Sequence, residues 1–137
     1  MESDATPLRR PDGGRWCDLG GAVLLAGDAR NLPEMRRIAT ALSPAAHVTV
    51  LVEAAVASQV EPLPAGGAAR VTWLVRSDGE GMRPRGERLA TAIHAWCAEW
   101  ACAADGSDPV CTVWLGARTP SRIVRMTRAL LPTPRVP

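Results

Sequence analysis

Apolar residues follow two different spacings along this chain, and the two spacings alternate. Continuous apolar runs, which are typical of buried strands, occur at 22–28, 47–53, 70–76 and 111–117. Segments with an apolar residue every three or four positions, which are typical of amphipathic helices, occur at 32–42, 87–104 and 119–131. Between them, 56–63 predicts a short connection with one helical turn and 77–86 predicts a loop.

Two of the predicted helices begin with residues that favour a helix N-terminus. Asn31 followed by Glu34 resembles a capping box, and Pro33 falls in the first turn, where its missing N–H does no harm. In the last helix, Thr119 is predicted as the N-cap and Pro120 as the first helical residue. Both helices are therefore expected to begin directly after a strand.

The alternation of strands and helices predicts the fold class. It favours a three-layer α/β fold, in which a parallel sheet carries helices on both faces, as in Rossmann-like domains. Right-handed crossovers then favour the strand order 3-2-1-4, with the strand at 22–28 in the interior of the sheet. Residues 1–20, rich in proline, glycine and charge, predict a flexible arm, and residues 21–137 a single domain.

In such a sheet, ligands bind beyond the carboxyl ends of the strands, where the strand order reverses. Here the reversal lies between strands 22–28 and 111–117. The candidate binding residues at these strand ends are Gly27, Asp28, Arg30, Asn31, Glu53, Arg76, Gly116, Arg118 and Thr119. Arg30 beside a helix N-terminus favours an anion site, although a plain turn with a solvated arginine is the alternative.

Both acids among these candidates have two interpretations. Asp28 either hydrogen-bonds a ribose or caps the turn. Glu53 ends the second strand, where dinucleotide-binding folds place a ribose-binding acid, and a solvent-facing strand end is the alternative. The sequence has no G-x-G-x-x-G fingerprint, since Gly20 and Gly21 precede the first strand.

Composition removes several classes of function. The net charge is only +2, and all 16 basic residues are arginine, as expected from a GC-rich genome, so no nucleic-acid binding is predicted. No apolar run reaches the ~20 residues that a membrane helix needs, and the N-terminus lacks a secretory pattern, so a cytoplasmic protein is expected.

The four cysteines form no C-x-x-C pair and predict no metal site. His47 and His94 have no nucleophile beside them, so no catalytic residues are predicted.

Two predicted helices carry tryptophan or arginine residues that suit either binding to a partner or an ordinary place in the core or on the surface. Trp96 and Trp100 lie one turn apart and predict either core packing or a partner surface. The last helix is basic, with Arg122, Arg125 and Arg128 following Arg118, which suits an anionic partner or a solvated face.

Four segments in order resemble the C-terminal half of siderophore-interacting proteins. They are AVLLAGDARNLPEMRRIATALSPAAHVTVLVE, EPLP, VTWLVR and VWLGARTPSRIVRMTRALL, and together they span roughly residues 22–131. That family is similar to ferredoxin–NADP⁺ reductases, with a flavin-binding barrel before a nicotinamide-binding α/β domain. The resemblance implies reduction of ferric siderophores with NAD(P)H and FAD.

The chain departs from the family pattern in its loops. The opening family motif reads approximately AGDETALPAI, and the residues that match it are Ala26, Gly27, Asp28, Leu32 and Pro33. Ala29, Arg30 and Asn31 replace its Glu-Thr-Ala segment, and Ala117 replaces an acid after the last strand. Pro62 and Leu63 match a second motif, and Gly116, Arg122 and Arg125 match a third.

About 20 residues precede the first strand, so the flavin barrel is expected to be absent. The resemblance then implies a stand-alone domain, most simply a non-catalytic or partner-dependent binding module. The alternatives are the NAD(P)H-binding subunit of a split flavin-dependent ferric-siderophore reductase, and a binder of a small metabolite. No cofactor is certain, weak NADPH binding is expected, and the partner is a flavoprotein or a second copy in a homodimer.

Overall fold

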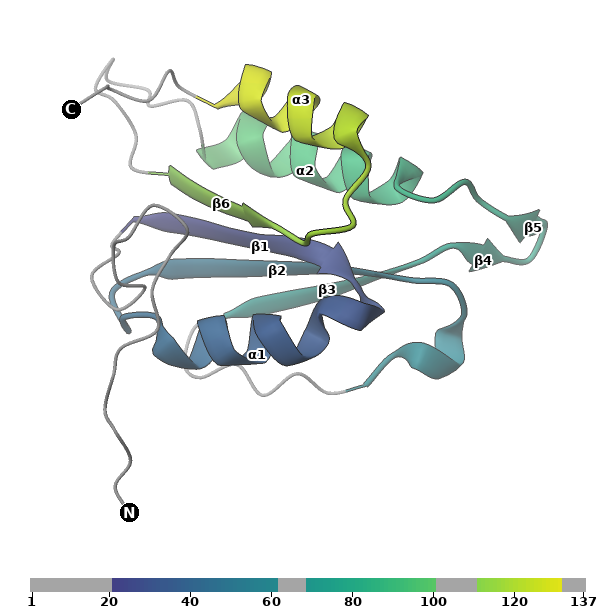
Figure 1. The fold of residues 1–137 in the computed structure, drawn as a ribbon, viewed down its shortest axis with the longest axis horizontal. Helices are drawn as coiled ribbons and strands as arrows, with labels where there is room; N and C mark the ends of the chain where they lie inside the picture. Colours follow the sequence, from purple (N-terminus) through teal and green to yellow (C-terminus); the bar gives the residue numbers. More distant parts are fainter. Residues whose placement is uncertain (1–20, 62–68, 101–110, 132–137) are drawn as a thin grey trace.

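The computed structural model describes residues 21–61, 69–100 and 111–131. Within them, four parallel strands form one sheet in the order β3-β2-β1-β6 (Figure 1). The strands are β1 (Ala22–Asp28), β2 (His47–Ala54), β3 (Arg70–Val75) and β6 (Cys111–Leu115). The predicted order, with the first strand in the interior of the sheet, is confirmed.

Helices cover both faces of this sheet, as the alternating pattern predicts (Figure 1). α1 (Leu32–Ala41) lies on one face, and α2 (Glu87–Trp100) and α3 (Ser121–Leu130) lie on the other. The chain therefore has a three-layer, Rossmann-like α/β fold. None of the helices in the described ranges is long and apolar enough to cross a membrane.

The core has two halves because alternate residues of β1 point to opposite faces of the sheet. Val23 and Leu25 pack on the α1 side, while Leu24 and Ala26 pack on the side of α2 and α3. β1 is buried from Ala22 to Gly27 and becomes partly exposed only at Asp28. The apolar core therefore ends where the polar edge of the sheet begins.

Trp96 belongs to the core under α2 and α3, where its side chain is only 5% exposed. The core alternative for this residue is correct, and Trp96 is wrong as a candidate for an exposed partner surface. Trp100 is half-buried and stacks on His47 with 5.5 Å between the ring centroids.

Asn31 is the N-cap residue of α1, as predicted, but the predicted N-cap of α3 is wrong. Asn31 makes no side-chain cap to α1, because its amide oxygen accepts the Asp28 backbone N–H instead. The N-cap of α3 is Pro120 and not Thr119, since the preceding residues form a turn in which the Thr119 N–H donates to the Gly116 carbonyl.

Short elements add detail to the connections. The 3₁₀ turns η2 (Ala29–Asn31) and η3 (Ala57–Gln59) follow β1 and β2, and η3 is the single helical turn expected within 56–63. The predicted loop 77–86 holds a small antiparallel hairpin of β4 (Ser77–Asp78) and β5 (Gly81–Met82). The predicted arm, residues 1–20, lies outside the described residues.

Candidate functional site

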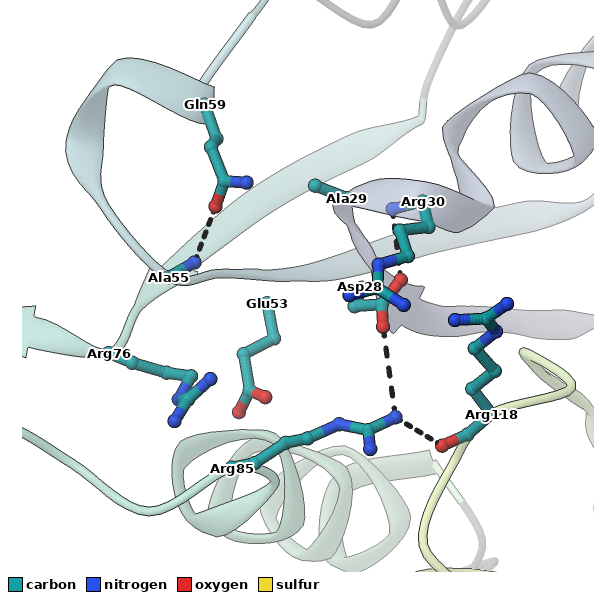
Figure 2. Close-up of a pocket in the computed structure, with 9 residues that line it drawn as sticks. All are labelled: Asp28, Ala29, Arg30, Glu53, Ala55, Gln59, Arg76, Arg85 and Arg118. Atoms are coloured by element: carbon teal, nitrogen blue, oxygen red, sulfur yellow. Dashed lines mark hydrogen bonds and ion pairs between the residues drawn. The ribbon is translucent and has the colours of Figure 1, made fainter.

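A cavity of about 180 Å³ lies beyond the carboxyl ends of the central strands (Figure 2). Its lining residues come from five segments and are Asp28, Ala29, Arg30, Glu53, Ala55, Gln59, Arg76, Arg85 and Arg118. We call this space the arginine cavity. It contains five of the residues predicted to bind a ligand, and their role in binding stays a prediction.

A second, much smaller hollow adjoins the arginine cavity at the β1–β6 boundary. It retains about 10 Å³ and shares Asp28, Glu53, Arg85 and Arg118 with its larger neighbour. Gly27, Asn31 and Thr119 also line it. We call this small hollow the crevice. Gly116 directly follows β6 and lies against Asn31, so all the predicted site residues lie at one edge of the sheet.

The turn after β1 sets the geometry of both spaces. The Asp28 carboxylate accepts the Arg30 backbone N–H at 2.9 Å, and the Asn31 amide oxygen accepts the Asp28 N–H at 3.0 Å. This reciprocal pair holds η2 as a tight turn between the strand and α1. Of the two interpretations of Asp28, the cap of the turn is therefore the one that the structure shows. The same turn places Arg30 at the wall of the arginine cavity.

Four guanidinium groups and two carboxylates line the arginine cavity. Arg85 is the most constrained, because its Nη2 donates to the Arg118 carbonyl at 2.5 Å and lies 3.9 Å from the Asp28 carboxylate. Arg76 donates through Nε to the Arg83 carbonyl at 3.1 Å. Within the described ranges, the guanidinium groups of Arg30 and Arg118 have no hydrogen-bond or ion-pair partner. The excess of positive charge favours an anion in this cavity.

Glu53 is buried at the inner wall of the site, with 4% of its surface exposed. Both of its carboxylate oxygens accept the Gly86 backbone N–H at 3.0 Å. The solvent-facing alternative for Glu53 is therefore wrong. Gly86 has a φ of +86°, and its carbonyl accepts the first hydrogen bond of α2, so Glu53 fixes the start of that helix. Through this contact it also positions the adjacent Arg85.

The side chain of Asn31 fills the crevice between Gly27 and Gly116. A Cβ atom on Gly27 would lie 2.5 Å from the Asn31 amide oxygen, and a Cβ atom on Gly116 would lie closer still. The Thr119 hydroxyl is buried beside the crevice and has no hydrogen-bond partner in the described part of the chain. The crevice is therefore closed by the chain itself, and the arginine cavity is not.

The two thiols in the described part of the chain, Cys97 and Cys111, lie away from this edge. Burial raises the pKa of the Cys97 thiol, with a smaller contribution from Cys111, and burial also raises the pKa of Cys111. Among the described residues, no histidine or cysteine lines the two spaces, and no cluster of three or more metal-ligating side chains occurs. The groups at the site can hold and orient an anion through hydrogen bonds and charge.

Comparison with known proteins decides the family. The family model for siderophore-interacting proteins matches residues 21–135, which is most of the chain. The chain belongs to the siderophore-interacting protein family. This confirms the resemblance given by the strand and loop motifs. A search of curated proteins finds no match.

Two crystal structures show the same fold. The siderophore-interacting protein SipS from Aeromonas hydrophila aligns with a TM-score of 0.58 and 16% identity, over 90% of this chain and 50% of SipS. A siderophore utilization protein from T. fusca aligns with a TM-score of 0.57 and 25% identity, over 88% of this chain and 43% of that protein. The chain thus spans about half the length of either structure.

Sequence analysis of this family member missed two residues of the site. Arg85 and Gly86 lie in a segment rich in glycine and arginine that predicts only a loop, and 33 positions separate Gly86 from Glu53. The available signal was the sequence RPRG immediately before a helix, since glycine at a helix start often marks a close backbone approach.

Proposed function

We propose that this chain is a partner-dependent binding module that holds the phosphate end of a nucleotide, with NADPH as the first candidate. One observation carries the proposal: four guanidinium groups from separate segments converge on one cavity at the carboxyl edge of a Rossmann-like sheet. Arginine is suited to this task because its planar fork matches phosphate oxygens. The unpaired Arg30 and Arg118 are the residues that would bind the phosphate directly.

The size of the cavity limits how much of a nucleotide it can bury. Pockets that enclose drug-sized ligands usually measure ~300–1,000 Å³, whereas this cavity has about 180 Å³. It fits one phosphate group with part of its sugar, and the rest of a dinucleotide would lie on the surface. We therefore expect weak binding, with a Kd above about 100 µM. A 2′-phosphate would favour NADPH over NADH.

Dependence on a partner is the second part of the proposal. Within the described residues, the groups at the site bind an anion and supply no electron acceptor. If the module takes part in reduction of a ferric siderophore, a flavoprotein would accept the hydride from the bound nucleotide. This is the split-reductase alternative. A phosphorylated metabolite in the same cavity is the other alternative.

A second copy of the chain is the other expected partner. Trp96 lies in the core, so Trp100 is the tryptophan that remains available for such an interface. If the chain is a homodimer anchored by Trp100, Trp100→Ala should weaken association by about 2 kcal/mol or more. Sedimentation tests this directly. A wild type that stays monomeric at high micromolar concentration contradicts the homodimer.

The experiment for the nucleotide site is a calorimetric titration of the chain with NADPH and with NADH. The decisive variant is the double charge reversal Arg30→Glu with Arg118→Glu, which should lower NADPH affinity by at least about 10²-fold. The matched control is Arg37→Glu with Arg128→Glu, which changes the net charge equally at exposed positions away from the cavity.

The control separates a local site from a general attraction between charges. The proposal requires the control variant to keep NADPH affinity within about threefold of the wild type. Equal losses in both variants, or no measurable binding of NADPH by the wild type at millimolar ligand, would contradict the nucleotide proposal. Tight binding in the low micromolar range would instead indicate that a larger surface than the arginine cavity takes part.

A further inference from the structure

The crevice between β1 and β6 lies at the reversal of strand order. The chain leaves β1 for α1 on one face of the sheet, and it leaves β6 for α3 on the opposite face (Figure 1). Connections that diverge in this way leave a gap at the carboxyl ends of the two strands. The residues at this gap therefore decide whether a ligand can enter between the strands.

Glycine occupies both sides of the gap, at Gly27 on β1 and at Gly116 directly after β6. Neither glycine has a positive φ, so backbone conformation does not demand glycine at either position. Their common requirement is room. A Cβ atom on Gly116 would meet three atoms of the Asn31 amide before any other group, and a Cβ on Gly27 would meet two.

The Asn31 amide does more than fill this room. Its oxygen accepts the Asp28 backbone N–H, which is the hydrogen-bond donor at the carboxyl end of β1. The Thr119 hydroxyl is buried on the other side of the crevice without a partner among the described residues. A polar environment is thus present, but the about 10 Å³ that remain are at the lower limit for a single water molecule.

We infer that Asn31 is an internal plug, a specificity-determining residue that excludes phosphate oxygens from the crevice and confines them to the arginine cavity. Asp28, Glu53, Arg85 and Arg118 line both spaces, so an anion that entered the crevice would remain next to the same two carboxylates and two guanidinium groups. Removal of the plug would free the Asp28 N–H and give a phosphate access to Thr119. The identity of the ligand rests on the proposed function, whereas the presence of the plug does not.

The first test needs no ligand. In the wild type, Gly116→Ala forces its new methyl group against Asn31 and should lower Tm by about 5 °C or more. In an Asn31→Ala background the same substitution has space, and it should lower Tm by less than half as much. Equal losses in the two backgrounds would show that Asn31 does not occupy the crevice, and would overturn the inference.

The second test measures exclusion, with inorganic pyrophosphate as the probe. Asn31→Ala should bind pyrophosphate about tenfold more tightly than the wild type in a calorimetric titration. Asn31→Asp keeps the size of the plug and its acceptor oxygen, so it should bind no more tightly than the wild type. Unchanged or weaker binding by a folded Asn31→Ala overturns the exclusion role.

The two proposals fail in different ways. If the wild type binds pyrophosphate and Asn31→Ala binds it no more tightly, the plug is overturned and the nucleotide site stays in place. Binding only by Asn31→Ala supports the plug and contradicts the proposed function of the wild type. If neither protein binds pyrophosphate at millimolar concentration while both are folded, both proposals are overturned.

Discussion

The crevice and the arginine cavity lie at the same edge of one sheet, yet they differ in how their polar groups are satisfied. In the crevice, Asn31 accepts the Asp28 N–H and takes the space beside two glycines. In the arginine cavity, Arg30 and Arg118 have no partner within the described ranges. The Thr119 hydroxyl at the crevice has no partner among the described residues, but Asn31 leaves no room for a ligand to reach it. The unpaired guanidinium groups of Arg30 and Arg118, by contrast, line an open cavity and would gain hydrogen bonds from an anion. The contrast supports the proposal that a ligand binds in the arginine cavity and not in the crevice.

Glu53 lines both spaces, and its loss is expected to have the largest effect. Glu53→Ala leaves the buried Gly86 N–H without its acceptor and opens a cavity, which together should cost about 3 kcal/mol of unfolding free energy. Denaturant unfolding measures this cost. Glu61→Ala at an exposed position is the control, and a loss below about 1 kcal/mol at Glu53 would show that α2 begins without this contact.

Gly27→Ala tests the crevice side alone. The new methyl group would lie 2.5 Å from the Asn31 amide oxygen, so we expect a loss of about 2 kcal/mol in unfolding free energy from overpacking. NADPH affinity should stay within about twofold, because the arginine cavity does not include this residue. A loss of affinity without loss of stability would mean that the ligand uses the crevice after all.

Arg76→Ala tests the cavity side alone. Arg76 lies half-buried at the end of β3, and removal of one charged donor should weaken NADPH binding by about tenfold, or about 1.4 kcal/mol. Arg70→Ala, at the exposed start of the same strand, is the matched control. If both variants bind NADPH equally well, Arg76 does not contact the ligand.

The smallest expected effect is a local response to acid in the hairpin beside Arg76. The pKa of Asp78 lies below its ordinary value, chiefly because the Glu80 backbone N–H donates to its carboxylate and because Arg83 also donates to it. A lowered pKa means that these contacts hold at neutral pH and are lost as the pH falls through that lowered pKa.

The Arg83 carbonyl also accepts a hydrogen bond from Nε of Arg76, which lines the arginine cavity. Loss of the Asp78 contacts in acid should therefore loosen the Arg76 side chain. The measurement is the rate of amide hydrogen exchange in the β4–β5 hairpin, divided by the intrinsic rate at the same pH and compared between neutral and acid pH. In Asp78→Asn the exchange should already be fast at neutral pH. Exchange that is slow in this variant would show that the carboxylate does not hold the hairpin.

The fold could be predicted from the sequence because its signals are local. The apolar run in β1 and the apolar stripe in α1 each act within a few residues, and the alternation of such elements leaves few topologies. The position of the site follows from the same topology. Helix caps were less predictable, because the Asn31 amide oxygen accepts the Asp28 N–H within the η2 turn instead of capping α1.

The interior of the site depends on contacts between distant segments. The bond from Gly86 to Glu53 crosses 33 positions, and Arg85 bonds to the Arg118 carbonyl across the same number. Periodicity and capping rules carry no information over such separations. The crevice shows the same limit, since Gly116 meets Asn31 only after the sheet has formed. Hence the sequence indicates which residues reach this edge, and packing decides which of them stay free.

The most direct test of this account is an NMR chemical-shift map of the wild-type chain titrated with NADPH. The account predicts shifts of the Arg30 and Arg118 side-chain Nε–H signals, while the backbone amides of Gly27 and Gly116 stay nearly unchanged. Large shifts at the two glycines with none at the arginines would place the ligand in the crevice. That result would contradict both the plug at Asn31 and the arginine cavity as the binding site.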